Sequence, residues 1–227
     1  MNYNIIIKNI KLLSDPKNVE GMARYGINPE MNYGVSIRDL RLMAGDIGTN
    51  HELALRLWAS GIRDARLLAT LVADPNKLTE SQAEEMVSGI DSWDICDGFC
   101  MNLVRHASFA RTKAREWSGR KEEFVKRAGF SLMATLAVHA KKSPDSDFEA
   151  LLPLIIREAS DDRNYVKKSV NWALRSIGKR NIALNKASLR VARELSQSTS
   201  TSARWIGRDA VRELESEAVI KKISRKR

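Results

Sequence analysis

The spacing of apolar residues limits, more than any other feature, what this chain can fold into. Apolar side chains recur every three or four positions along almost all of it, as at Leu53, Leu57 and Trp58, whereas the alternation of β-strands is nearly absent. That spacing gathers apolar residues on one face of a helix, and such a face must pack against other helices. The sequence therefore predicts an all-α protein.

Helix pairs recur along the chain after an irregular start. Residues 26–34 contain two glycines, a proline and two asparagines, which predicts a loop or a broken helix. Ser36 with Asp39, and Thr79 with Gln82, are typical of helix N-termini. The second helices of the later pairs are predicted to begin near residues 62, 91, 125, 166 and 203, in steps of 29, 34, 41 and 37 residues. Irregular steps of this length are typical of armadillo and HEAT repeats.

The predicted fold is consequently an α-solenoid of antiparallel helix pairs, HEAT-like or armadillo-like. It is expected to be curved, with the second helices lining a concave basic groove. We expect residues 1–220 to form a single domain of such repeats. Residues 221–227 are rich in Lys and Arg, and we expect them to form a disordered basic tail.

Charge and composition narrow the class of partner. Among 227 residues, 38 Lys and Arg outnumber 28 Asp and Glu, which gives a net charge of +10. This balance favours a polyanion such as nucleic acid or an anionic membrane surface, although a basic surface also serves solubility alone. No stretch reaches the ~18 apolar residues of a membrane span, and the histidines and cysteines lack the spacing of a metal site. We expect a cytoplasmic monomer, nucleoid-associated when bound to DNA, with no metal, no cofactor and no membrane contact.

An acid and an indole share one helical face near the middle of the chain. Trp93 and Asp97 are four residues apart, so on a helix they lie one turn apart. A second candidate indole, Trp172, belongs to a later second helix. Candidate phosphate contacts recur near the starts of the second helices: Arg63, Arg66, Lys126, Arg127, Lys167, Lys168, Arg204 and Arg208. A basic stripe interleaved with tryptophans is typical of a surface that follows a phosphate backbone.

Each of these residues also has a purely structural interpretation. A single Lys or Arg commonly solvates an exposed helix face. Trp93 and Trp172 could seal interfaces between repeats, and Asp97 could pair with a neighbouring arginine. Asp94 is an alternative acid, although its offset from Trp93 takes it off the shared face. The other tryptophans are assigned to the core or to rim packing: Trp58, Trp117 and Trp205.

Several segments resemble one family of repair enzymes, in the same order over nearly the whole chain. They are Met22–Tyr25, Tyr33–Val35, Ser92–Asp97, Val125–Ala128 and Lys167–Arg175, and together they resemble the DNA alkylation-repair glycosylases built from HEAT-like repeats, the AlkD type. The resemblance implies a monofunctional glycosylase that removes N3- and N7-alkylated purines from double-stranded DNA without flipping the damaged base. The chain departs from the family at residues 26–34, which are richer in loop-forming residues.

The resemblance also implies a role for each matching residue. Asp97 would be the catalytic carboxylate, and Trp93 and Trp172 the indoles that cradle the deoxyribose of the lesion. Tyr25 matches the tyrosine of the same cleft, and Arg127 matches an arginine that contacts the DNA backbone.

Cationic purines need little catalytic machinery. Alkylation at N3 or N7 makes the base a good leaving group, so that the sugar becomes oxocarbenium-like and no general acid is required. A carboxylate ~4 Å from that charge, at an effective dielectric of about 20, contributes about 4 kcal/mol, or about a thousandfold in rate. Each indole face would add roughly 0.5 to 2 kcal/mol. Two alternatives stay open: a HEAT-like DNA-binding protein without excision activity, and a protein-binding scaffold.

Overall fold

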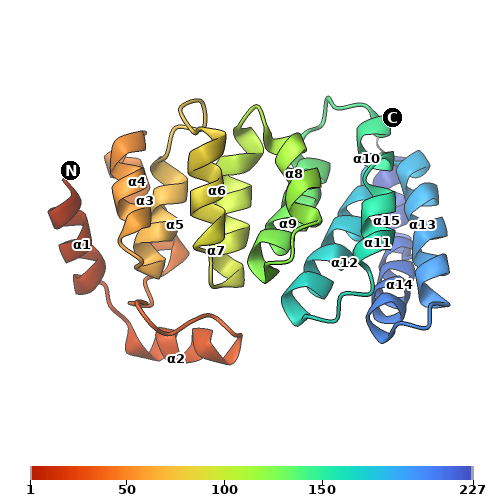
Figure 1. The fold of residues 1–227 in the computed structure, drawn as a ribbon, viewed down its shortest axis with the longest axis horizontal. Helices are drawn as coiled ribbons and strands as arrows, with labels where there is room; N and C mark the ends of the chain where they lie inside the picture. Colours follow the sequence, from red (N-terminus) through yellow and green to blue (C-terminus); the bar gives the residue numbers. More distant parts are fainter. Residues whose placement is uncertain (1, 226–227) are drawn as a thin grey trace. The chain divides into compact units, whose positions relative to one another are not determined.

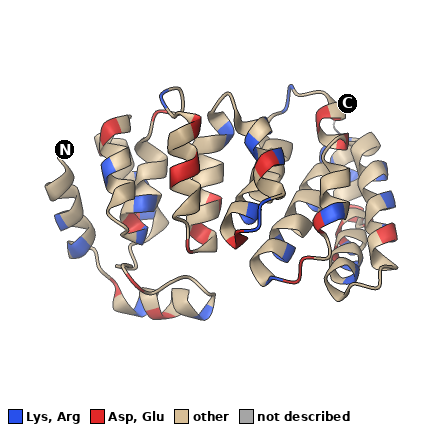
Figure 2. Cartoon of the chain, in the orientation of Figure 1, with Lys and Arg blue, Asp and Glu red and all other residues tan. Residues whose placement is uncertain are grey.

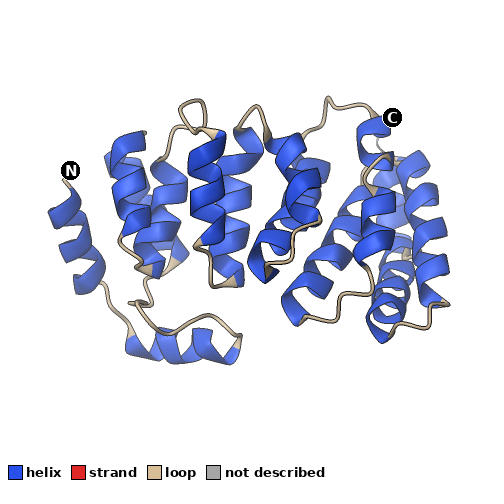
Figure 3. Ribbon diagram, viewed as in Figure 1, coloured by secondary structure: helices blue, strands red, loops and turns tan. Residues whose placement is uncertain are grey.

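The computed structural model describes residues 2–225, and contacts within the chain divide it into two compact units, residues 1–109 and 110–227. The described residues form helices, turns and loops and contain no strand (Figure 3). The predicted all-α fold is therefore confirmed. No helix among residues 2–225 is both long enough and apolar enough to cross a membrane.

The described residues of the first unit form seven α-helices (Figure 1). The last of them is followed by a π-helical turn, which is wider than an α-helix, and then by a 3-10 turn, which is tighter. They are α1 (Tyr3–Leu12), α2 (Pro16–Arg24), α3 (Ile37–Ile47), α4 (His51–Ala59), α5 (Arg63–Val72), α6 (Glu80–Ser88) and α7 (Trp93–Gly98), followed by a π-helical turn at Phe99–Leu103 and a 3-10 turn at Val104–His106. The predicted caps are confirmed, because Ser36 accepts from the Asp39 N–H and Thr79 forms a reciprocal capping box with Gln82. These local signals fix where α3 and α6 begin.

The second unit contains eight helices. They are α8 (Ala110–Ser118), α9 (Glu123–His139), α10 (Asp145–Glu149), α11 (Leu152–Glu158), α12 (Asn164–Gly178), α13 (Ile182–Ser196), α14 (Thr201–Leu214) and α15 (Glu217–Ser224). Helix α9 packs against α8 and α12, and it is buried almost all round from Val125 to Ala137. Such a helix forms the centre of a core, because it has no polar face to present to water. The other close pair is α13 with α14.

The helix pairs agree with the repeat pattern predicted from the sequence. The second helices begin at Arg63, Trp93, Glu123, Asn164 and Thr201, each within a few residues of the predicted start. The chain is therefore an all-α, HEAT-like solenoid of helix pairs. Whether residues 1–220 act as a single domain stays a prediction, as does the concave groove.

The expected disordered tail is wrong for its first residues. Helix α15 runs from Glu217 to Ser224, with Ser216 as its N-cap, and therefore includes residues 221–224. Val219 and Ile223 lie on one face of it and are 8% and 2% exposed. Burial of these two apolar side chains stabilises the helix despite its two lysines. Residues 226 and 227 lie outside the described part of the chain.

Candidate DNA-contacting site

Helix α7 carries the predicted acid and indole, and the indole donates to a backbone carbonyl at the C-terminal end of α2. The Trp93 indole N–H donates to the Tyr25 carbonyl oxygen at 3.0 Å. Tyr25 follows α2 and is 77% exposed. Asp97 follows Trp93 by one turn of α7, and both side chains are half-buried. The structure therefore brings together three of the residues predicted for the site.

The other aspartate of α7, Asp94, is held by a buried arginine. Arg63, at the start of α5, donates from Nε to Asp94 Oδ2 at 2.7 Å, and Ser92 Oγ donates to Asp94 Oδ1 at 2.5 Å. Arg63 also donates from Nη1 to Asp64 Oδ1 at 3.0 Å. Arg63 is only 5% exposed. Predicted as a phosphate contact, Arg63 is thus committed to two carboxylates inside the protein.

Asp64 connects this ion-pair network to the irregular segment before α3. Its carboxylate accepts the backbone N–H of Tyr33 at 2.7 Å and that of Val35 at 3.0 Å. Nearby, Asn28 Nδ2 donates to Asp91 Oδ2 at 2.8 Å, just before α7. The predicted loop over residues 26–34 is therefore present, and polar contacts attach it to α5 and to the residues that precede α7.

The end of α7 departs from regular helix geometry directly after the predicted acid. A π-helical turn spans Phe99–Leu103, and Asn102 Nδ2 donates to Thr70 Oγ1 at 2.9 Å across to α5. A Cβ on Gly98 would lie 2.8 Å from Leu67 Cδ2, so α7 and α5 approach closely here. Inserted residues of this kind alter the direction of neighbouring side chains and are frequent at functional sites. The sequence contained no signal for this feature.

Trp172, the second predicted indole, lies on α12 in the second unit. It is half-buried and lines a pocket of about 610 Å³. The basic side chains of that pocket are Lys141, Lys179, Arg180 and Lys222. Trp172 therefore lies near several basic side chains, and its role at the site stays a prediction. Because Trp93 and Asp97 belong to the first unit, the convergence of Trp172 with them stays a prediction.

Lys126 and Arg127, at the start of α9, are both buried. The Lys126 ammonium donates to Glu158 Oε2 at 2.6 Å and to Asp161 Oδ2 at 3.0 Å. Arg127 is 6% exposed and donates from Nη1 to the Tyr165 carbonyl at 2.8 Å. These bonds attach α9 to α11 and α12. A DNA contact by either residue stays a prediction, and it would require the side chain to leave its present partners.

Of the other predicted cations, Arg66 lies on α5, where it pairs with Asp91 at 3.6 Å and donates to the Gly89 carbonyl at 3.1 Å, and the rest lie on α12 and α14. Lys168 and Arg208 are exposed, and neither forms an ion pair with another described residue. Arg204 donates to the carbonyls of Ser198 and Thr199 at 3.0 and 2.7 Å, so it stabilises the turn before α14. Lys167 lies over the ring of Trp205, with Nζ 5.2 Å from the ring centroid. Lys168 and Arg208 are thus the predicted cations best placed to bind a phosphate.

The tryptophans assigned to packing divide into two kinds. Trp58 and Trp117 are 7% and 0% exposed, as expected of core residues. Trp205, by contrast, is 41% exposed on α14. The sequence contained one indication of this exposure, because Trp205 lies three residues before Arg208 and therefore on the same face of the helix.

Positive charge is distributed over both units of the chain. Figure 2 shows Lys and Arg interspersed with Asp and Glu along the helices of each unit.

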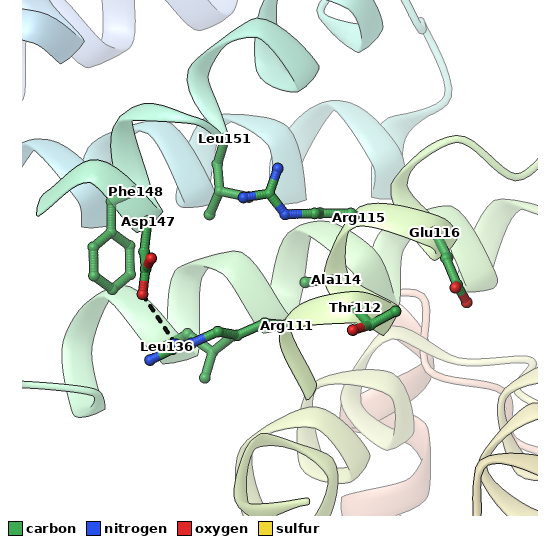
Figure 4. Close-up of a pocket in the computed structure, with 9 residues that line it drawn as sticks. All are labelled: Arg111, Thr112, Ala114, Arg115, Glu116, Leu136, Asp147, Phe148 and Leu151. Atoms are coloured by element: carbon green, nitrogen blue, oxygen red, sulfur yellow. Dashed lines mark ion pairs between the residues drawn. The ribbon is translucent and has the colours of Figure 1, made fainter. Parts of the chain in front are cut away.

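A pocket of about 350 Å³ lies between α8, α9 and the α10 region, away from the predicted residues (Figure 4). Its Arg111 is paired with Asp147 at 3.0 Å. None of the predicted site residues lines this pocket, so it is not part of the candidate site.

Two known proteins are similar to this chain in sequence, and one solved structure has a similar fold. An uncharacterized protein of Listeria innocua is 24% identical over 213 residues, covering 84% of this chain and 93% of that protein. An uncharacterized protein of Listeria monocytogenes is 22% identical over 182 residues, covering 78% and 79%. A solved structure, described as a new family of proteins related to the HEAT-like repeat DNA glycosylases with affinity for branched DNA structures, has a TM-score of 0.78 at 19% identity and covers 93% of this chain and 95% of its own.

The family itself follows from a match over most of the sequence. The model of the DNA alkylation repair enzyme family matches residues 6–214, which include α7, α12 and α14. The resemblance first noted in short segments thus extends over both units. This chain belongs to the DNA alkylation repair enzyme family.

Proposed function

We propose that this protein is an alkylpurine DNA glycosylase that hydrolyses the N-glycosidic bond of N3- and N7-alkylated purines in double-stranded DNA, without base flipping. The observation that carries the proposal is on α7. The Asp97 carboxylate lies half-exposed one turn from the Trp93 indole, while the neighbouring acid, Asp94, is held by buried Arg63. Membership of the alkylation repair family supports the same substrate class.

In this reaction Asp97 acts on the sugar rather than on the base. As the C1′–N bond breaks, its electrons pass to the cationic purine, which leaves as a neutral base. The Asp97 carboxylate stabilises the positive charge that develops on the sugar and accepts a proton from the water that adds to C1′. Trp93 presents an aromatic face to the same charge. Intact purines are poor leaving groups and would react too slowly to be released.

Base release from methylated DNA tests the catalytic step. DNA treated with dimethyl sulfate is incubated with excess protein, and free 7-methylguanine and 3-methyladenine are separated by chromatography. Asp97→Asn should reduce the single-turnover rate by about a thousandfold, because it removes about 4 kcal/mol of charge stabilisation. Its affinity for DNA should be unchanged or higher, since a negative charge is lost.

A neighbouring carboxylate serves as the matched control. Asp91 lies just before α7 and its side chain is 50% exposed, so Asp91→Asn should leave base release within a few-fold of the natural protein. If the natural protein releases no alkylated base, the catalytic part of the proposal fails. Trp172→Ala should also lower release if Trp172 supplies the second indole, and an unchanged rate would remove Trp172 from the mechanism.

The second candidate is a DNA-binding protein without excision activity. The solved structure of similar fold is described as having affinity for branched DNA, and exposed Lys168 and Arg208 suit phosphate binding in either case. Both candidates predict affinity for duplex DNA that falls steeply with salt, by about 0.9 in log–log slope per phosphate contacted. A protein-binding scaffold would show little such dependence. Binding with no base release would favour this second candidate.

A further inference from the structure

Helices α12 and α14 are joined by a ladder of polar contacts, two of which have a sequence separation of 38. Asn171 donates to Asp209 at 2.7 Å, and Arg175 donates to Glu213 at 2.5 Å, each across 38 residues. The separation is close to one repeat step, so equivalent positions of successive second helices face each other. Lys179 adds a contact to Glu213 at 2.6 Å. The ladder places donors of α12 against acids of α14.

The first pair of facing residues in this ladder, which we call its first rung, does not follow the pattern. One turn before Asn171 is Lys167, and one turn before Asp209 is Trp205. Lys167 Nζ lies 5.2 Å from the centroid of the Trp205 ring, where the pattern would place a carboxylate. The ammonium is therefore held by an aromatic face, which leaves its charge unneutralised. The indole itself is 41% exposed to solvent.

The surroundings of Trp205 are basic. A groove of about 340 Å³ along α14 includes Trp205 together with Arg204, Arg208 and Arg212. The acid in the groove, Asp209, already accepts from Asn171 and pairs with Arg175 at 3.3 Å and with Arg212.

An exposed indole among cations suits one class of partner. A base stacks on an aromatic face only where it is unpaired and unstacked, and nearby Lys and Arg then bind the flanking phosphates. Bases within an intact duplex present only their edges. We propose that the Lys167–Trp205 rung is a stacking site for an unpaired nucleotide of DNA, such as the single-stranded arm of a fork. This inference rests on the proposed DNA binding and adds a partner structure and a residue to it.

Three variants separate stacking from charge and from folding. Trp205→Glu places a carboxylate opposite Lys167 and so completes the ladder, which should preserve the fold. Trp205→Phe keeps an aromatic ring. Ile182→Glu is the matched control, because Ile182 is 49% exposed on α13 and its replacement adds the same negative charge elsewhere.

Binding is measured by fluorescence anisotropy with a labelled duplex and with a fork that has the same duplex and two unpaired dT arms. Trp205→Glu should weaken fork binding about tenfold more than it weakens duplex binding, whereas Ile182→Glu should weaken the binding of both probes alike. Trp205→Phe should stay within about threefold of the natural protein for the fork. The emission of Trp205, obtained by subtracting the spectrum of Trp205→Phe, should be quenched by the fork and not by the duplex.

The outcomes distinguish the two proposals. If the natural protein binds DNA but the Trp205→Glu and Ile182→Glu variants affect fork and duplex alike, and the fork leaves Trp205 emission unchanged, the stacking site is overturned while DNA binding stands. If the natural protein binds neither probe, the proposed function fails as well. The emission measurement needs no glutamate variant, so it decides the question even if Trp205→Glu does not fold.

Discussion

On α7, Asp94 and Asp97 lie three residues apart, yet their carboxylates meet different surroundings. Asp94 receives Arg63 and Ser92 at 2.7 and 2.5 Å and its side chain is 11% exposed. Asp97 is half-buried one turn from Trp93. A carboxylate bound by a buried guanidinium is fixed in place, so we infer that Asp94 positions the helix, and the proposed catalytic role stays with Asp97.

Asp94→Ala should therefore reduce stability as well as activity. The substitution leaves buried Arg63 with Asp64 as its remaining acidic partner, and loss of a buried charged hydrogen bond costs about 2 to 4 kcal/mol. Urea unfolding at 25 °C measures the change. Asp91→Ala is the control, because it removes only contacts at the surface, a 3.6 Å ion pair with Arg66 and an exposed hydrogen bond from Asn28, and should change the free energy of unfolding by about 1 kcal/mol. Equal losses in the two variants would contradict a positioning role for Asp94.

Sequence reasoning could reach some of these residues and not others. Trp93 and Asp97 share a face because of local helix geometry, which the four-residue spacing predicts. The bond from Trp93 to the Tyr25 carbonyl spans 68 residues, and the pair of Arg63 with Asp94 spans 31. The second separation is close to a repeat step and could have suggested facing positions. Nothing local could have shown that Lys126 and Arg127, basic residues at a helix start, would be buried against α11 and α12.

At the scale of elements, the segment between α2 and α3 is held by close approach as well as by hydrogen bonds. Gly34 has φ +72°, and Asp15 N–H donates to the Tyr33 carbonyl at 2.8 Å. A Cβ on Gly34 would lie 2.4 Å from the Asp15 carbonyl oxygen and 2.9 Å from Val19 Cγ2. Glycine is therefore required here for both its conformation and its size.

Gly34→Ala should destabilise the protein by about 3 kcal/mol or more, because the left-handed conformation costs about 1 to 2 kcal/mol and the clash adds to it. Gly61→Ala offers a matched control. Gly61 has φ +73°, but a Cβ there would meet nothing within 4 Å, so only the conformational cost of about 1 kcal/mol applies. Chemical denaturation of both variants makes the comparison. If the two substitutions cost the same, the packing of this segment against α2 contributes nothing.

Helix boundaries were predictable where they depend on neighbouring residues. Ser36 and Thr79 cap α3 and α6 as expected, because an N-cap bond reaches only three residues ahead. The break between α10 and α11 also lies beside a local signal, Pro153 in the first turn of α11. The π-helical turn after Gly98, by contrast, depends on packing against other helices. Helix α15 was missed for the same reason, since burial of Ile223 outweighs the basic composition of the segment.

At the scale of the whole molecule, the repeat architecture determines which residues can act together. Within each unit, polar contacts between equivalent positions of neighbouring helix pairs recur at about one repeat step, as between Arg63 and Asp94 in the first unit and Arg175 and Glu213 in the second. The periodicity that predicted the fold thus also organises the ion pairs within it. At the position where Trp205 takes the place of an acid on α14, the positive charge of Lys167 is available to a binding partner.

Ion pairs of the second unit make a further prediction about acid stability. Burial raises the pKa of Asp161, but hydrogen bonds from Arg163 and Lys126 outweigh that effect and lower the pKa from 3.8 to about 2. For Glu158, burial again raises the pKa, while hydrogen bonds from Lys126 and Arg157 lower it overall. Carboxyls whose pKa is depressed in the folded protein contribute stability that is fully present above their unfolded pKa and is lost as the pH falls through the folded pKa.

The melting temperature should therefore change little from pH 7 to about pH 5 and then fall between about pH 4 and pH 2. Asp161→Asn tests the origin of that fall, because it removes the carboxylate that binds Lys126 and Arg163 at 3.0 and 2.6 Å. At pH 7 the variant should melt below the natural protein, and the gap should narrow as the pH falls toward 2, where about half of Asp161 in the natural protein is itself protonated. Circular dichroism at 222 nm during heating follows both proteins. A gap that persists unchanged down to pH 2 would mean that the Asp161 side chain stabilises the unit through packing rather than through its charge.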